Sequence, residues 1–437
     1  MAVMTRRRWG AMAMIAAVAL AGAAACGDNG EEPGDETEQI TLTVDLFGEE
    51  GFGYDALYEQ YMAENPNITI EERGLGLGLG DYNDRLVQQI VAGSGAGDVV
   101  ALEEGTIVQF YAQTDRFVNL ADHGANELEG NFLPWKWAQG APGGFVLGLG
   151  TDVGSLAVCY RTDLYEAAGL PGDRAEVGQL WGSWEDFIAA GEQFAAADTG
   201  VAFLDAATNF YNSVLMSVAG DSSGYTYFTP DGQLDLENPD IRTAWDLTIQ
   251  MIDADLSAGL NTFSDEWNAG IQNSAFATNA CPAWMTGVIQ GGAGDAVEAG
   301  LWDVAEPPAG GNWGGSFLAV PAETEHPEEA AKLAMFLTSP EAQTTAFEAV
   351  GVLPSSPQAL ASDAVAQASN EYFSGAPTGQ IFGAGAEALR PVYLGPLNQA
   401  VRAAYEGALQ SVEQGEATPD EAWEAARSDA ELAARGG

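Results

Sequence analysis

The chain has 437 residues, of which 46% are hydrophobic, and this is enough for one large core or two medium ones. Its 64 acidic residues against 15 basic ones give a formal net charge of −49, which excludes nucleic-acid binding and attachment to anionic lipids through a basic face. With two lysines and two histidines, the chain has no P-loop lysine and little scope for a His-based metal site, so we expect no cofactor and no metal.

The N-terminus has the pattern of an export signal. Arg6–Arg8 precede an apolar run over residues 11–25, which is too short to span a bilayer as a permanent helix. The run ends in Ala23-Ala24-Ala25-Cys26, which resembles a bacterial lipobox, although Ala23 stands where Leu is usual. We expect a signal peptide over residues 1–25, lipidation at Cys26 and a flexible acidic tether over 26–38. Ordinary secretion with an unmodified Cys26 is the alternative.

The next part of the chain alternates between strand and helix patterns. Glycines at 48, 51 and 53 interrupt the first strand, and Asn65-Pro66 ends the first helix. This rhythm predicts a parallel sheet flanked by helices. The expected elements are a strand over 40–47, a helix carrying Tyr54, Leu57, Tyr58, Tyr61 and Met62, a strand from Ile68 to Ile70, a helix carrying Leu86, Ile90 and Val91, and a strand that begins at 98–100.

Later helices are marked by their first residues. Ser183 is expected to cap a helix that buries Trp184 and Phe187, Pro327 to open another, and Thr418 to precede the last one. No internal repeat of 20–50 residues occurs. Because about 400 ordered residues exceed what one core holds, we expect two α/β lobes.

Two cysteines lie in the middle of the chain, Cys159 and Cys281. If Cys26 carries lipid, these two can pair in the oxidising exterior. Two buried free thiols are the alternative, and the spacing does not decide between them.

Six segments in order resemble the extracellular solute-binding protein family that serves sugar ABC transporters. Within it, CYR, FATNACPAWMTG, GGNWGGSFLAVP and PVYLGP are most similar to actinobacterial proteins that bind cellobiose and related β-linked oligosaccharides. The resemblance covers nearly the whole mature chain. The segments are Tyr54–Ile70, Asp81–Leu102, Leu149–Leu170, Phe276–Gly287, Gly310–Gln343 and Arg390–Val401.

This resemblance implies an α/β, two-lobe, periplasmic-binding-protein-like fold with hinge-crossing segments and a ligand cleft between the lobes. The crossings are expected near Gly150–Gly154, near Gly314–Val320 and after Leu353. The lobe boundaries that it implies are 39–151 with 317–355 for lobe I, and 152–316 with 356–437 for lobe II.

A sugar presents C–H faces that aromatic rings cover, and a rim of hydroxyls that Asp, Glu and Asn side chains bind. Trp313, beside Asn312 and between glycines, is a candidate for ring stacking, as are Trp284 after Pro282 and Trp267 among polar neighbours. Each could instead pack a lobe or fill a core.

For the hydroxyls, residues that follow predicted strands are favoured, because parallel sheets bind ligands at the carboxyl ends of their strands. The alternatives for all of them are a solvated surface or a helix cap. The candidates are Glu49, Glu103, Glu104, Asp152, and, from a segment that resembles a cleft-facing one of the family, Asn209 and Tyr211.

We therefore expect no enzyme but a monomeric sugar-binding lipoprotein on the outer face of the cell membrane, held there by its lipid alone, which delivers an oligosaccharide to ABC permease subunits. A secreted glycoside hydrolase acting on β-linked oligosaccharides is the alternative, because Glu49-Glu50 and Glu103-Glu104 could supply two carboxylates. The excess of acids over lysines is typical of an acidic proteome, and we expect a halophilic habitat.

Overall fold

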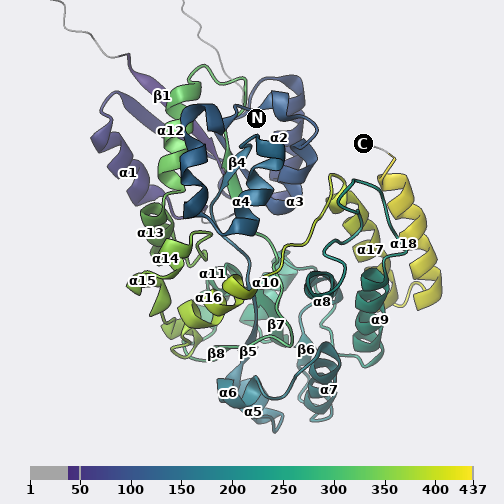
Figure 1. The fold of residues 1–437 in the computed structure, drawn as a ribbon. Helices are drawn as coiled ribbons and strands as arrows, with labels where there is room; N and C mark the ends of the chain where they lie inside the picture. Colours follow the sequence, from purple (N-terminus) through teal and green to yellow (C-terminus); the bar gives the residue numbers. More distant parts are fainter. Residues whose placement is uncertain (1–37, 49–50, 436–437) are drawn as a thin grey trace, which may run out of the picture. The chain divides into compact units, whose positions relative to one another are not determined.

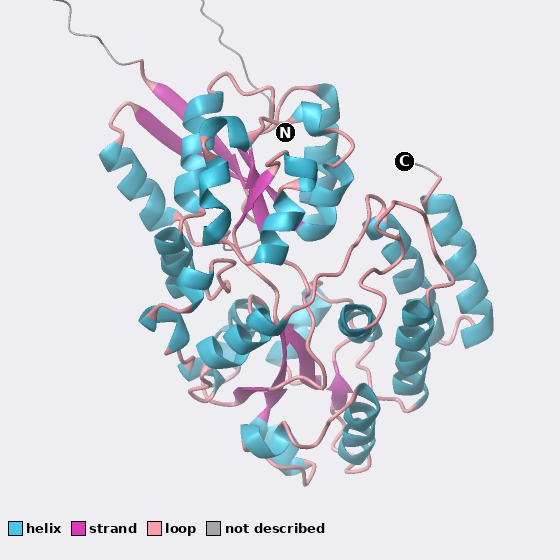
Figure 2. Ribbon diagram, in the orientation of Figure 1, coloured by secondary structure: helices cyan, strands magenta, loops and turns pink. Residues whose placement is uncertain are grey.

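A computed structural model describes residues 38–48 and 51–435 of the chain (Figure 1). The predicted signal peptide, the lipidation site Cys26, the tether up to residue 37 and Glu49 lie outside the described residues. From Gln39 onward the chain forms one compact unit. It contains two sheets surrounded by helices, and the sheets occupy separate regions of the ribbon (Figures 1 and 2).

The first sheet has five strands in the order β2-β1-β3-β9-β4. The neighbours of β1 are parallel to it, as the strand–helix–strand rhythm predicts. β9, which returns from much later in the chain, is antiparallel to both β3 and β4, so the sheet as a whole is mixed. The strands are β1 (Ile40–Asp45), β2 (Ile68–Arg73), β3 (Val99–Glu103), β4 (Gly148–Gly150) and β9 (Ser316–Ala319).

The second sheet has the order β6-β7-β5-β8, and only β6 and β7 are parallel. Cys159 on β5 and Cys281 on β7 are both fully buried and form a disulfide. The bond therefore joins two neighbouring strands of the same sheet. The strands are β5 (Leu156–Arg161), β6 (Ala202–Leu204), β7 (Phe276–Pro282) and β8 (Trp302–Ala305).

Helix starts follow the capping residues in the sequence. The Ser183 hydroxyl accepts a hydrogen bond from the Asp186 amide at 3.1 Å and begins α7 (Trp184–Ala195). Thr418 and Glu421 form a reciprocal capping box that begins α18 (Pro419–Ala433). Both starts confirm the prediction. Further helices used below are α1 (Asp55–Glu64), α2 (Leu79–Ala92), α3 (Glu104–Ile107), α4 (Pro134–Gly140), α8 (Ala207–Asp221), α10 (Asp265–Gln272), α11 (Met285–Ala293), α12 (Pro327–Leu337), α13 (Pro340–Val350) and α17 (Asn398–Glu413).

The helix faces follow the predicted periodicity with one exception. Leu57, Tyr58 and Tyr61 of α1 are buried, and so are Leu86 and Ile90 of α2. The exception is Val91, which is 56% exposed because it lies one residue beyond the buried stripe of α2.

The chain passes between the two sheets through three segments, which we call the first, second and third crossings. They are residues 151–155 between β4 and β5, residues 306–315 between β8 and β9, and residues 351–356 after α13. Backbone hydrogen bonds join them side by side: the amide of Val153 donates to the carbonyl of Leu353 at 2.9 Å, and that of Trp313 donates to Gly154 at 2.8 Å.

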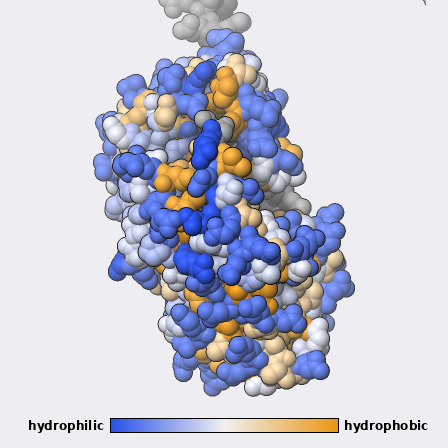
Figure 3. Space-filling model, turned by 90° about the vertical axis from the view of Figure 1, so that its right-hand side faces the viewer, coloured by the Kyte–Doolittle hydropathy of each residue, from blue (hydrophilic) through white to orange (hydrophobic). Residues whose placement is uncertain are grey.

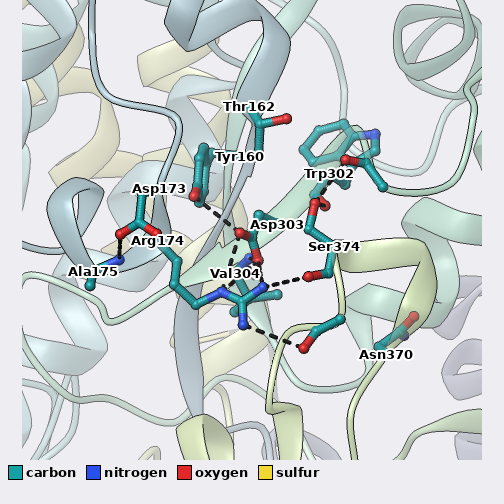
Figure 4. A network of polar contacts seen from close by, with 12 residues as sticks. Tyr160, Thr162, Asp173, Arg174, Ala175, Trp302, Asp303, Val304, Asn370 and Ser374 are labelled. Carbon is teal, nitrogen blue, oxygen red and sulfur yellow. Dashed lines mark hydrogen bonds and ion pairs between the residues drawn. The ribbon is translucent and has the colours of Figure 1, made fainter.

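Cations are few, and several of them are held inside the fold. The Arg174 guanidinium forms a salt bridge of 2.8 Å with Asp303 on β8 and donates to the carbonyl of Ser374 at 2.8 Å (Figure 4). Asp303 also accepts a hydrogen bond of 3.3 Å from the Tyr160 hydroxyl. These contacts connect β5 and β8 to the loop that contains Ser374. On the face shown in Figure 3, hydrophilic residues predominate and hydrophobic ones form smaller areas.

Candidate ligand-binding site

Two buried glutamates lie at the carboxyl end of β3: Glu103 is its last residue, and Glu104 follows it and contacts the second crossing. The Glu103 side chain caps the amino end of α3 by accepting a hydrogen bond of 2.7 Å from the amide of Gly105. Glu104 accepts hydrogen bonds from the Asn312 side-chain amide at 2.6 Å and from the Gly314 backbone amide at 3.0 Å. The Glu104 carboxyl group, at the carboxyl end of β3, is therefore hydrogen-bonded directly to the second crossing, the segment that leaves the second sheet.

Asp152 and Asn312 extend this cluster across the first crossing. Asp152 is buried, and its Oδ1 accepts a hydrogen bond of 2.9 Å from the amide of Ser316. The Asn312 Oδ1 accepts one of 2.9 Å from the amide of Gly154. Glu103, Glu104, Asp152 and Asn312, all predicted as candidates, thus lie in one polar cluster where the crossings meet.

Two half-buried tryptophans lie next to the cluster. The Trp284 indole donates a hydrogen bond of 2.9 Å to the carbonyl of Trp313, and the ring centroids are 5.8 Å apart at an interplanar angle of 71°. Phe263, which is 53% exposed, lies 6.0 Å from the Trp284 ring. Together these rings form an aromatic surface at the amino end of α11, of the kind that packs against sugar C–H groups.

Glycines make this close approach possible. Gly314 has a φ of +87°, and a Cβ there would lie 3.1 Å from the Trp284 Nε1. A Cβ at Gly154 would collide with the carbonyl group of Trp313. A side chain at Gly314 would push Trp284 away from the second crossing, and one at Gly154 would push the first crossing away from the second.

Burial shapes the electrostatics of the cluster. It raises the pKa of Glu104 to about 8, and the neighbouring charge of Glu103 raises it as well. Burial likewise raises the pKa of Glu103, while it lowers the pKa of the Lys136 ammonium. Lys136 on α4 acts on both glutamates in the opposite direction, because a nearby cation favours a carboxylate.

A small cavity adjoins Glu104 and Asn312. Its volume is about 10 Å³, which holds about one water molecule in this conformation. A sugar can enter only if its walls move apart. The residues around it are Glu104, Trp135, Gln139, Met216, Asn312, Leu389, Arg390, Pro391 and Val392.

A larger groove of about 820 Å³ lies elsewhere, between α11 and α13. Its walls include Gln290, Phe347, Glu348 and Tyr372. None of the candidate residues predicted from the sequence lines it.

Trp267 and Asn209 occupy a different place, around a buried acid. The Trp267 side chain is fully buried, and its indole donates a hydrogen bond of 2.8 Å to Asp205. Asn209 and Asn279 donate to the same carboxylate at 3.0 and 2.8 Å. Burial raises the pKa of Asp205 to about 6. These residues join β6, β7, α8 and α10, so Trp267 and Asn209 support the core, and we leave them out of the candidate site.

Tyr211 lies in the core beneath the C-terminal helices. It is fully buried, its hydroxyl is 3.1 Å from that of Tyr227, and its ring stacks on Tyr405 with 6.1 Å between centroids. It presents no surface to a ligand in this conformation, so it too is left out. Glu49 lies outside the described residues.

Two buried charged residues, Lys136 beside the site and Asp205 in the core, were not predicted from the sequence. Lys136 is one of only two lysines in a very acidic sequence, and this rarity is the signal that could have indicated it. Asp205 carries no local pattern that distinguishes it from the other acids. The loop at Arg390–Val392 was found only through the PVYLGP resemblance.

Among the described residues, no group of three or more His, Cys, Asp or Glu side chains could hold a metal ion. No helix within that part of the chain is both long and apolar enough to cross a bilayer.

Comparisons with known proteins agree with this geometry. Residues 56–372 match the model of a family described as bacterial extracellular solute-binding protein. A crystal structure described as extracellular solute-binding protein family 1 is 38% identical over 90% of this chain and 100% of its own, with a TM-score of 0.80. Among curated protein sequences, none matches the chain significantly.

Two sugar complexes share the fold at lower identity. An ABC transporter-associated binding protein from B. animalis subsp. lactis in complex with β-1,6-galactobiose is 21% identical, with a TM-score of 0.76 over 91% of this chain and 98% of its own. The galacto-N-biose/lacto-N-biose I-binding protein from Bifidobacterium longum in complex with lacto-N-biose is 17% identical, with a TM-score of 0.74 over 92% of this chain and 98% of its own.

Proposed function

Because the chain belongs to the bacterial extracellular solute-binding protein family, we propose that it captures an oligosaccharide outside the cell and delivers it to the permease of an ABC transporter. The chain is a binding protein and not an enzyme. The observation that carries the sugar proposal is that two arrangements lie side by side. Asn312 is hydrogen-bonded to Glu104, and the half-buried Trp284 is hydrogen-bonded to the carbonyl of Trp313, the residue after Asn312.

The chemistry of this cluster suits a neutral sugar. The indole rings of Trp284 and Trp313 would cover C–H faces. Glu103, Glu104 and Asp152 would accept hydrogen bonds from hydroxyls, and the Asn312 amide would donate one. Glu49, which follows the first strand, is proposed as a further hydroxyl partner.

Cellobiose or a related β-linked sugar is the proposed ligand. Its support is the resemblance of FATNACPAWMTG, GGNWGGSFLAVP and PVYLGP to binding proteins for such sugars. Two proteins that share the fold have structures in complex with β-1,6-galactobiose and with lacto-N-biose. This supports the proposal that the ligand has two or more sugar units.

Capture would proceed by hinge closure. We assign residues 39–151 and 317–355 to lobe I and residues 152–316 and 356–437 to lobe II, with the three crossings as the hinge. The cavity of about 10 Å³ beside Glu104 requires the lobes to separate before a sugar enters. Contacts from both lobes would then favour the closed state, so that binding shifts the population toward it.

The location of the protein follows from its family, which is extracellular. We propose that residues 1–25 are removed, that Cys26 carries a lipid, and that residues 26–38 connect the lipid to the folded unit. The lipid would be its one membrane contact, and the protein would act as a monomer.

Titration calorimetry of the exported protein against cellobiose, cellotriose, xylobiose, maltose and β-1,6-galactobiose tests the proposal. Binding of at least one β-linked sugar with a Kd in the micromolar range or below, about −8 kcal/mol or stronger, is expected. Absence of binding across the panel would overturn the sugar proposal. Prolonged incubation with cellotriose should release no shorter sugar, and its release would instead support a glycoside hydrolase.

A further inference from the structure

Lys136 on α4 is fully buried, although a lysine is rarely buried without a partner. No described residue accepts a hydrogen bond from its Nζ, and no salt bridge within the described chain includes it. The face of Phe317 lies against the charge, with its ring centroid 3.9 Å from Nζ in a cation–π arrangement. An isolated ammonium in such a place is costly, so its position requires an explanation.

The three crossings meet around this side chain. A Cβ at Gly150, the last residue before the first crossing, would lie 2.8 Å from the Lys136 Cγ and 2.9 Å from the Ser355 Oγ of the third crossing. A Cβ at Gly315, the last residue of the second crossing, would lie 3.0 Å from Nζ. The glycines admit the lysine, and the lysine fills the space where the hinge segments converge.

Three buried carboxylates act on the charge of Lys136: those of Asp152, Glu104 and Glu103. Each of them accepts a hydrogen bond from a backbone amide and not from Lys136. The donors are Ser316 for Asp152, Gly314 for Glu104 and Gly105 for Glu103. The three carboxyl groups and the Lys136 ammonium are all buried. Arg402 also acts on Glu103, but its side chain is 28% exposed.

We propose that Lys136 is a positioning residue for ligand binding: from the junction of the three crossings, its buried charge favours the carboxylate form of Glu104, which accepts hydrogen bonds from Asn312 and Gly314 and would accept them from a sugar. This inference rests on the proposed function. Lys136 would contact no sugar itself. It would act through Glu104, the carboxylate that connects the first sheet to the second crossing.

The electrostatics of Glu104 give the role a measurable sign. Burial raises the pKa of Glu104 to about 8, and Lys136 acts against that rise. Removing the cation should let Glu104 keep its proton to a still higher pH. The charged and titratable groups that face Glu104 are Glu103, Asp152, Lys136, Tyr111, Arg402 and Arg390.

The first experiment needs no ligand. The side-chain amide of Asn312 donates to Glu104 at 2.6 Å, so its ¹⁵N NMR signal reports the ionisation of that carboxylate. We expect its titration midpoint to lie near 8 in the unaltered protein and about one pH unit higher in Lys136→Met. Lys136→Gln gives the same readout if the methionine does not pack. An unchanged midpoint in a folded variant would overturn the proposal.

Lys332→Met is the matched control, because Lys332 is the other lysine and lies exposed on α12, paired with Glu328. It should leave the midpoint unchanged. The second experiment measures the pH dependence of affinity for the sugar identified by calorimetry. Its midpoint should move with the amide midpoint in Lys136→Met, and a sugar profile that does not move would overturn the role in binding. Failure of the unaltered protein to bind any sugar would count against the proposed function, while the amide titration would still decide whether Lys136 acts on Glu104.

Discussion

The side-chain amide of Asn312 donates a hydrogen bond of 2.6 Å to Glu104, which lies 208 residues earlier in the chain. The same side chain accepts a hydrogen bond from the amide of Gly154 through its oxygen. One asparagine therefore connects a carboxylate of the first sheet to the first crossing.

Asn312→Ala should weaken sugar binding about 10- to 100-fold, because a buried carboxylate would lose a charge-assisted donor worth about 1.5–3 kcal/mol. Titration calorimetry with the sugar identified from the panel provides the measurement. Asn273→Ala is the control, because Asn273 is exposed at the end of α10 and should not affect the Kd. Equal affinities for the two variants would contradict the assignment of Asn312.

Trp284→Ala and Trp313→Ala should each reduce the binding free energy by about 2–4 kcal/mol, if each ring packs on a sugar. Calorimetry again gives the Kd. Trp423→Ala serves as the matched control, because Trp423 packs against Trp245 and Tyr405. That change should lower the melting temperature without altering the Kd. Unchanged affinity in the first two variants would remove them from the site.

Asp205→Asn should alter how stability depends on pH. The pKa of Asp205 is raised to about 6 in the fold from 3.8, so the folded protein binds this proton more tightly than the unfolded chain does. Burying the ionised carboxylate lowers the free energy of unfolding by about 3 kcal/mol above pH 6, and this destabilisation is relieved as the pH falls toward 4.

Urea unfolding at pH 7 and pH 5 measures this effect. Relative to Asp205→Asn, the unaltered protein should gain stability as the pH falls between these values. A parallel pH dependence in both proteins would mean that Asp205 does not titrate in this range. Asp246→Asn is a suitable control, because Asp246 is half exposed and paired with Arg242 on the same helix.

Replacing both Cys159 and Cys281 by alanine should lower the free energy of unfolding by about 3–5 kcal/mol, because the disulfide closes a loop across 122 positions. Thermal unfolding with and without reductant provides the measurement. Reductant should lower the melting temperature of the unaltered protein only. An equal melting temperature of both proteins would show that the bond does not stabilise the fold.

Salt should stabilise the protein. With a formal net charge of −49, raising NaCl from about 0.1 M to about 2 M should raise the melting temperature, because ions screen the repulsion between acids. Sorbitol at equal osmolarity is the control for effects other than screening. A melting temperature and an affinity that do not respond to salt would contradict adaptation to a saline medium.

Local signals in the sequence predicted local structure well. Ser183 and Thr418 cap helices because their hydroxyls accept hydrogen bonds from the amides three residues later, and both partners of each bond are close together in the sequence. The strands and helices up to β3 follow in the same way from periodicity. Antiparallel β9 could not be predicted like this, because its partners β3 and β4 lie far away along the chain.

Part of the candidate site could be predicted, because some of its residues also carry local signals in the sequence. Glu104, Asn312, Trp284 and Trp313 carry signals in their glycine neighbours, their place after strands and the family resemblance. Trp267 has equally polar neighbours in sequence, yet its indole lies fully buried against Asp205. A polar neighbourhood along the chain does not indicate which face of a helix packs inward.

The Cys159–Cys281 disulfide has a practical consequence for optical sensing. These are two of three cysteines in the chain, and the third is the expected lipid attachment point. Expression without residues 1–38 would therefore leave no reactive thiol, and one cysteine placed at Phe263 could be labelled alone. Phe263 is 53% exposed beside Trp284, so a fluorophore there would be quenched or released as the aromatic surface is covered, and would convert ligand capture into a light signal.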